Sequence, residues 1–399
     1  TLFVFTLLVT APALAAPTWE AGSARINLTP RQFMWMSGYG GRTVPADGKL
    51  TDIWAKAVVL RDAQKNEVVL ITADLVGIGT ESTKWVAEQL KKNHGLERNQ
   101  FAIATSHTHT GPALSDNLVP LHFLRADEAQ QNRIAQYTQQ MRQMLVDVVG
   151  LAYKEMEPAY LTSGSGHCTV AVNRRTNREA EVPQKRLEGK LNGPFDHDVP
   201  VLAIRNAEYE LKTVVFGYAC HSTVLSFTQW SGDYPGFAQL ELEKRYPGID
   251  AMFWAGCGAD QNPLPRRTVE LAQHYGQRVA QSVDSVLLGA MESVEGGLSA
   301  HYQEIAGKTQ EPISRSDLNE LLENGNQYEK PFAQYVLGKR DNVNPPPRTY
   351  PYPVQTWHIG DIKMVFLGGE VVVDYALKIK KTATSVSDKK IWVAGYAND

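Results

Sequence analysis

The chain has 399 residues, of which 43% are hydrophobic and 21% are charged, and its formal net charge is −3. This balance is typical of a globular protein with a large apolar core, and it excludes a disordered or fibrous chain. No basic cluster points to nucleic acid, and after the first residues no segment is long and apolar enough to cross a membrane.

The first residues predict an export signal. Residues 2–9 form a short apolar run, and Ala13-Leu14-Ala15 follows as a small-x-small cleavage pattern. A buried N-terminal helix is the alternative, but Pro12 and Pro17 interrupt it. We therefore interpret residues 1–16 as a signal-peptide remnant, and we expect a secreted or periplasmic protein with residues 17–399 as one domain.

Short β-rich runs alternate with helical segments along most of the chain. The expected helices cover residues 81–93, 131–153 and 269–288. The pattern predicts an α/β fold, with a mixed β-sheet core flanked by helices and a functional site at the carboxyl ends of strands. The expected strands cover residues 55–61, 68–73, 101–105, 199–205, 213–218, 251–254 and 362–366.

Residues 308–352 differ from the rest of the chain because they are polar and contain three consecutive prolines. Only one short helix is expected in them, at residues 316–324. We interpret this segment as an insertion over the sheet edge or the mouth of the site, not as a separate domain.

The three cysteines, Cys168, Cys220 and Cys257, contain no C-x-x-C pair. A thiolate zinc site is therefore not expected, and we interpret all three as small buried residues. One disulfide stays open as an alternative in an oxidising compartment.

Several predicted strands run directly into polar clusters. Residues 101–105 precede His107 and His109, residues 213–218 precede His221, and residues 362–366 precede Glu370. A fourth strand leads into the glycine-rich acidic turn at residues 256–262. Because ligands bind outside the carboxyl ends of strands in α/β sheets, these clusters are expected to share one pocket.

The residue types in these clusters suit a catalytic zinc ion. His107 and His109 alternate along an extended segment and therefore project to the same side. Two histidines and a carboxylate such as Glu370 hold zinc and leave one position open for water. The residues alone leave two alternatives open. One of the two histidines could be a structural residue, and Glu370 could pair with an arginine or a helix N-terminus instead of a metal.

Two further residues are candidates for supporting roles. Arg174 follows a strand-like run at 169–172 and either stabilises an oxyanion or belongs to a surface basic pair. Asp74 either orients a ligand histidine or caps a turn. Other chemistries lack their motifs: the sequence has no G-x-S-x-G elbow, H-E-x-x-H pair or P-loop.

Taken together, these motifs resemble the N-terminal catalytic domain of the neutral/alkaline, non-lysosomal ceramidases. The most specific match is Ser106-His107-Thr108-His109-Thr110-Gly111-Pro112. The other matching segments follow in the family's order over nearly the whole mature chain and cover residues 21–30, 37–39, 172–174, 220–222, 368–370 and 395–398.

The resemblance implies a Zn²⁺ ion held by His107, His221 and Glu370, with His109 as the acid/base group and Arg174 at the reacting group. It implies cleavage of a linear amide in an N-acylated, lipid-like substrate of the sphingolipid type. Metal-activated water is the simpler nucleophile here, because the serine that is proposed as the family's nucleophile is absent. Contact with a membrane surface stays open, and no nucleic-acid partner is expected.

The chain departs from the family pattern at two points. The family's zinc-binding tyrosine is expected a few residues beyond residues 395–398, where the chain stops, and Tyr396 is out of register with it. The turn at residues 258–263 has no serine where ceramidases carry their proposed nucleophile. We therefore expect a divergent, truncated member. Two alternatives stay open: a zinc hydrolase of another amide or ester, cell-wall or sugar-linked, and an exported binding protein that has lost catalysis.

Overall fold

The computed structural model describes residues 16–340, 348–384 and 390–399. Residues 1–15 of the predicted export signal and the proline run at residues 345–347 lie outside the described residues.

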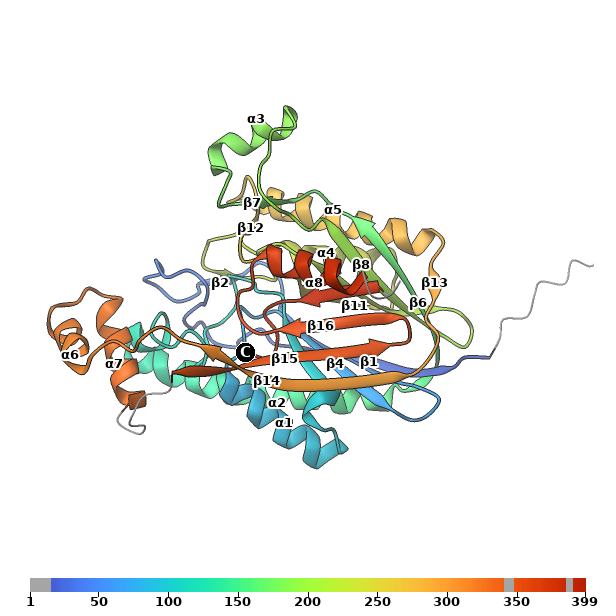
Figure 1. Ribbon diagram of the computed structural model, residues 1–399, viewed down its shortest axis with the longest axis horizontal. Coiled ribbons are helices and arrows are strands. Elements are labelled where there is room, and N and C mark those ends of the chain that lie inside the picture. The colour runs from blue at the N-terminus through green and yellow to red at the C-terminus, as the bar shows by residue number, and fades with distance from the viewer. Residues whose placement is uncertain (1–15, 341–347, 385–389) are drawn as a thin grey trace, which may run out of the picture.

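A mixed sheet forms the centre of the molecule (Figure 1). Its strands, in spatial order, are β11 (Asp250–Ala255), β9 (Leu211–Tyr218), β8 (Asp198–Asn206), β6 (Glu157–His167), β1 (Trp19–Asn27), β3 (Trp54–Arg61), β4 (Glu67–Ala73) and β5 (Phe101–Thr105), with the short β13 (Glu292–Ser293) beside β6. The pairs β9–β11 and β4–β5 are parallel, and the other pairs are antiparallel. The predicted mixed sheet is therefore confirmed.

A second sheet packs on one face of the first. It consists of β14 (Leu298–Lys308), β15 (Thr349–Ile359), β16 (Ile362–Leu367) and β17 (Lys390–Ala394). Alternate residues of a strand point to opposite faces. In β3, Val58 and Leu60 share a core with Trp357 and Phe366 of the second sheet. Ala55, Ala57 and Val59 of the same strand turn to the opposite face and belong to a different core.

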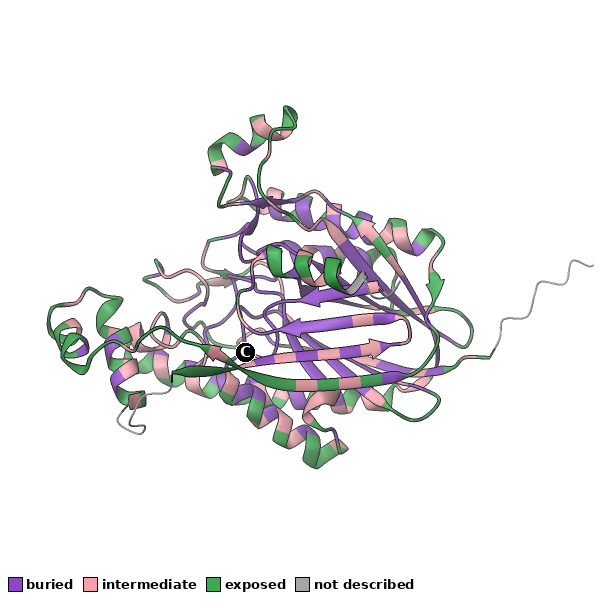
Figure 2. Ribbon diagram, viewed as in Figure 1, coloured by how far each residue is buried: buried purple, intermediate pink, exposed green. Residues whose placement is uncertain are grey.

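Four helices cover that opposite face. α1 (Thr80–His94) and α2 (Glu128–Lys154) pack over β1, β3 and β4, whereas α4 (Asp233–Arg245) and α5 (Val269–Leu288) pack over the half that contains β8, β9 and β11. Figure 2 shows that the strands between these layers are mostly buried. The predicted helices correspond to α1, α2 and α5, and α5 has the bounds that the sequence predicted.

Several shorter elements complete the described chain. They are β2 (Gly48–Lys49), β7 (Ala171–Asn173), α3 (Val182–Leu187), β10 (Gln229–Trp230), β12 (Gln261–Pro263), α8 (Val373–Thr384) and three 3-10 turns, η1 (Arg98–Gln100), η2 (Phe123–Arg125) and η3 (Glu179–Glu181). β7 pairs with β12, so the segment before Arg174 lies beside the glycine-rich acidic turn.

The polar insertion joins β14 to β15 and projects from the body of the molecule in Figure 1. Its described residues form two helices, α6 (Arg315–Asn324) and α7 (Glu329–Arg340), of which the sequence predicted only the first. Their shared apolar core is small and consists of Leu318, Ala333 and Leu337. The amphipathic signal of α7 is correspondingly weak.

The three cysteines are buried free thiols, as the sequence predicted. Within the described ranges, every helix is too short or too polar to span a bilayer.

Candidate metal centre

Three strand ends bring His107, His221 and Glu370 together. His107 lies two residues after β5, His221 lies three after β9, and Glu370 lies three after β16. A β-bridge between Thr108 and Ser222 joins the first two loops. Residues far apart in the sequence therefore meet at one end of the sheets.

The distances between these side chains suit a common ion. The Nε2 atoms of His107 and His221 are 3.1 Å apart. The Glu370 carboxylate oxygens lie 3.7 Å from Nε2 of His107 and 3.5 Å from Nε2 of His221. Ligands about 2.0–2.1 Å from a tetrahedral zinc ion are roughly 3.3 Å from one another. The three donors are therefore spaced as ligands of one small cation.

Hydrogen bonds fix the protonation of the two imidazoles. Nδ1 of His107 lies 2.5 Å from the Val76 carbonyl, and Nδ1 of His221 lies 2.7 Å from the Gly258 carbonyl. A carbonyl only accepts, so each Nδ1 carries its proton. Burial, together with His221, lowers the pKa of His107 to about 3, and His107 is therefore neutral at pH 7. Its Nε2 lone pair faces the centre, as in a metal-binding histidine whose other nitrogen is held.

His109 is the third imidazole of the cluster. Its Nε2 lies 3.0 Å from Nε2 of His107, and the ligand nitrogens of His107, His109 and His221 all lie within 4.8 Å of one another. The buried Nδ1 of His109, in contrast, has no hydrogen-bond partner. Burial and the neighbouring His107 lower the pKa of His109 well below its usual range.

Glu370 closes the open side of the cluster. The imidazoles are buried, whereas the Glu370 side chain is 50% exposed. Burial of its carboxyl raises the pKa of Glu370, but the neighbouring His221, His107 and Arg174 outweigh this effect and lower it to about 2. The Glu370 carboxylate is thus ionised at neutral pH and lies on the exposed side of the cluster.

Arg174 is held at the site by the glycine-rich acidic turn. Its backbone N–H donates to the Asp260 carbonyl, and the Asp260 carboxylate accepts from Asn173 Nδ2 and from Val373 N. Asp260 therefore ties the arginine segment to the loop that carries Glu370. The Arg174 guanidinium lowers the pKa of Glu370. The buried Nε of Arg174 has no hydrogen-bond partner in the protein.

Tyr396 and Gln261 border the candidate metal centre, and neither residue was predicted to have a role in it. Tyr396 stacks on His107 with ring centroids 4.1 Å apart, and its hydroxyl lies 3.4 Å from Nδ1 of His221, the nitrogen that does not face Glu370. Gln261 occupies the turn in which the resemblance implied a serine. It is fully buried, and its Nε2 donates to the Pro194 carbonyl.

Asp74 does not orient a ligand histidine. Its carboxylate accepts from Trp54 N and interacts with Ser106 and Gln239, while backbone carbonyls hold the Nδ1 atoms of His107 and His221. The structure shows neither of the two roles that the sequence left open, because the Asp74 carboxylate holds the start of β3 at Trp54 and the start of the loop at Ser106.

Sequence reasoning missed the loop that packs against His109. Tyr39 meets the His109 ring edge-on, with centroids 4.8 Å apart, and the buried Arg42 donates to the His109 carbonyl. Ser37-Gly38-Tyr39 was part of the family resemblance, which is the one signal that pointed to this loop. Arg42 and the buried His122 lie in no recognisable pattern.

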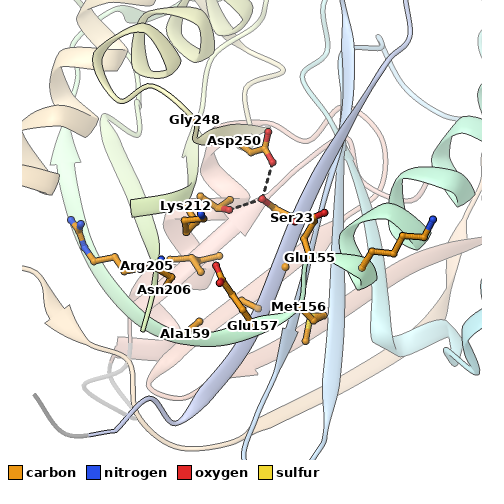
Figure 3. A pocket seen from close by; sticks show the side chains of 15 residues that line it. Ser23, Glu155, Met156, Glu157, Ala159, Arg205, Asn206, Lys212, Gly248 and Asp250 are labelled. Atoms are coloured by element: carbon orange, nitrogen blue, oxygen red, sulfur yellow. Dashed lines mark hydrogen bonds between the residues drawn. The ribbon is translucent and has the colours of Figure 1, made fainter. Parts of the chain in front are cut away.

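A separate polar cavity of about 420 Å³ lies at the opposite end of β9 and β11. Figure 3 shows Ser23, Lys212 and Asp250 on its wall, with Ser23 bonded to Asp250. Lys212 and Asp250 stand at the beginnings of these strands, whereas the imidazole cluster follows the end of β9. This cavity is therefore distinct from the candidate metal centre.

Sequence comparison identifies relatives of the chain. A family described as "Neutral/alkaline non-lysosomal ceramidase, N-terminal" matches residues 20–262. The neutral ceramidases of Drosophila pseudoobscura pseudoobscura and Drosophila melanogaster are each 24% identical over 261 residues, which cover 62% of this chain and 36% of the relative. The match thus spans about a third of the length of these curated relatives.

Structural comparison supports the same fold. The crystal structure of neutral ceramidase from Pseudomonas aeruginosa superposes with a TM-score of 0.74 at 20% identity, over 96% of this chain and 68% of that one. A structure of a ceramidase complexed with C2 gives a TM-score of 0.74 at 18% identity, over 96% and 69% of the two chains.

Proposed function

Because the chain belongs to the neutral/alkaline non-lysosomal ceramidase family, we propose that it is an exported, zinc-dependent hydrolase that cleaves the amide bond of an N-acylated, lipid-like substrate. The relatives named neutral ceramidase support the substrate class, since ceramide is an N-acyl lipid. Export rests on the apolar run and cleavage pattern at residues 1–16.

One observation supports the metal most directly. The Nε2 lone pair of His107 faces Nε2 of His221, Nε2 of His109 and the Glu370 carboxylate, at 3.0–3.7 Å. A single proton can relieve only one of these contacts. A divalent cation relieves several at once, and imidazole with carboxylate suits zinc.

Two imidazoles are the better ligands. A metal-binding histidine normally donates its other ring nitrogen to a carbonyl or carboxylate, which His107 and His221 do and His109 does not. We therefore assign His107, His221 and Glu370 to the metal. We assign proton transfer to His109, because no partner fixes the proton on its Nδ1.

The chain's own residues then have defined tasks in amide hydrolysis. A bound zinc ion would supply Lewis acidity for the substrate carbonyl and would lower the pKa of water toward about 7. His109 takes a proton from the attacking water and gives it to the leaving amine. Arg174 stabilises the negative charge that develops on the carbonyl oxygen. Gln261 offers no hydroxyl, so water is the nucleophile.

The test combines metal content with turnover. Purified protein is loaded with zinc, and bound zinc and hydrolysis of N-acyl-sphingosine are measured for the wild type, His107→Ala and His221→Ala. We expect both variants to lose zinc and activity, while His274→Ala on the exposed face of α5 keeps both. Retention of zinc and activity by the two site variants would refute the assignment.

A substrate panel separates the proposed amidase from the alternatives. The zinc-loaded wild type is offered N-acyl-sphingosine, N-acyl amino sugars and simple esters. Preference for N-acyl-sphingosine supports the proposed substrate class, and preference for either other group replaces it. Tight binding of the N-acyl lipid without any turnover identifies a binding protein.

A further inference from the structure

A fourth buried histidine lies close to His109. His122 lies in the segment between β5 and α2, directly before η2, and is fully buried. Its Nε2 accepts a hydrogen bond of 3.0 Å from the Gly38 backbone N–H. Neither the zinc assignment nor the proposed proton transfer uses this residue.

Gly38 links this hydrogen bond to the His109 ring, against which its Cα lies. Gly38 has a φ of +94°, and a Cβ atom at this position would overlap the His109 ring. No slack therefore separates the Gly38 backbone from the imidazole. The preceding residue is anchored as well, because Ser37 N donates to the Gly111 carbonyl. Rotation of the Gly38 peptide toward the ring would therefore displace the imidazole.

Apart from the contact of its Nε2 with Nε2 of His107, 3.0 Å away, the ring of His109 has few other restraints. Its Nδ1 has no partner, and Tyr39 touches it only edge-on. Arg42 holds the backbone carbonyl of His109 and not its side chain. The orientation of the imidazole is thus set mainly by packing, and Gly38 forms one wall of that packing.

His122 is suited to hold this wall. Burial and the positive charges of Arg42 and Arg125 lower the pKa of His122 to about 4, so the ring is neutral at pH 7 and Nε2 is free to accept. If the acceptor is lost, the Gly38 N–H is left without a partner, at a cost of about 1–3 kcal/mol. The peptide would then turn toward another acceptor.

We propose that His122 is a positioning residue for hydrolysis: it fixes the Gly38 peptide, and the Gly38 peptide holds the His109 imidazole in the orientation that proton transfer requires. This inference deepens the proposed function and rests on it for the role of His109. It assigns His122 no contact with metal or substrate.

The test uses the reach of the side chain. In His122→Gln the amide oxygen extends about as far as Nε2 and can accept from Gly38. In His122→Asn the amide extends only about as far as Nδ1, and His122→Leu has no acceptor. His274→Leu, on the exposed face of α5, serves as the matched control. For each zinc-loaded variant, kcat, KM and bound zinc are measured with N-acyl-sphingosine.

We expect His122→Leu and His122→Asn to lower kcat roughly 10- to 100-fold, the range seen for supporting residues, with KM and bound zinc unchanged. His122→Gln should stay within about threefold of wild type. Equal kcat for the glutamine and asparagine variants, or loss of zinc in either, would overturn the proposal. The comparison of the glutamine and asparagine variants decides the question even where the leucine variant does not fold.

Crystal structures of the glutamine and asparagine variants distinguish failure of this inference from failure of the proposed function. A wild type that hydrolyses no N-acyl substrate removes the proposed function. In that case, displacement of the His109 ring in His122→Asn but not in His122→Gln still supports the positioning role. An unmoved ring in both variants contradicts it.

Discussion

The two sides of the imidazole cluster are held in different ways. On one side, His107 and His221, the carbonyl-held pair, each donate Nδ1–H to a backbone carbonyl. On the other side, His109 has an unpartnered Nδ1 and is oriented by packing against Gly38 and Tyr39. A directional bond fixes a ligand, whereas packing leaves the ring free to exchange protons. The contrast matches the roles that we propose, with metal binding assigned to His107 and His221 and proton transfer to His109.

The largest expected effect comes from His109. We expect His109→Ala to lower kcat roughly 10²- to 10⁴-fold, the usual contribution of a general acid–base, while the bound zinc stays at the wild-type level. The measurement is kcat together with zinc per protein. Loss of zinc from this variant would show that His109 is a third histidine ligand, and the contrast between the two sides would then disappear.

The next largest expected effect tests how His221, one of the carbonyl-held pair, is supported. Asp260 accepts from Asn173 Nδ2 and Val373 N, and its turn supplies the Gly258 carbonyl that holds His221. Asp260→Ala leaves two buried donors unpaired. We therefore expect a loss of about 2–5 kcal/mol in the free energy of unfolding, measured in urea.

Zinc binding distinguishes Asp260 from an ordinary stabilising residue. We expect Asp260→Ala also to weaken zinc affinity, because the turn that holds His221 loosens, whereas Asp260→Asn keeps one acceptor and shows a smaller loss of both quantities. An alanine variant as stable as the wild type contradicts the role of this turn.

The sequence predicted the carbonyl-held side better than the packed side. His107, His221 and Glu370 each follow a strongly apolar strand, and strand ends meet where parallel strands share a direction, so pattern alone brought them together. His122 and Arg42 lie in loops with no periodicity. Their positions depend on how loops far apart in the sequence pack, which no local pattern records.

The same limit applies to the fold. The expected strands were β-branched and apolar, whereas β1 and β6 contain serine, glycine and charged residues and were missed. These two strands owe their places to tertiary pairing, as Gly22 of β1 shows. A Cβ atom at this glycine would overlap the backbone at the end of α2. Propensity within the strand is overridden by close packing between elements.

A third prediction sharpens the contrast through pH. Burial, with the charges of Arg42 and Arg125, lowers the pKa of His122 to about 4 from an ordinary 6.5. Between these pH values the unfolded chain binds a proton that the folded chain does not, so stability is lost as pH falls. From pH 7 to pH 5, the free energy of unfolding of the wild type should fall about 2 kcal/mol more than that of His122→Gln.

Urea unfolding at both pH values measures this difference, and all other titrating groups cancel in the comparison. Equal losses for the two proteins would mean that His122 takes up a proton in the folded state as readily as in the unfolded chain. The lowered pKa expected of a buried ring whose Nε2 accepts from Gly38 would then be contradicted.

The smallest expected effect concerns the contact between Tyr328 of the polar insertion and the loop that contains Gly38. The Tyr328 hydroxyl lies 3.4 Å from the Gly40 carbonyl, and Arg125 stands 4.6 Å from the Tyr328 ring. Because these groups are exposed, we expect Tyr328→Phe to change the free energy of unfolding by less than about 0.5 kcal/mol, and Tyr328→Ala to lower it by about 0.5–1 kcal/mol. Both variants should keep kcat within about twofold. A tenfold loss of kcat with zinc unchanged would mean that the insertion also holds the Gly38 loop, because Gly40 is the point at which Tyr328 and Arg125 reach that loop.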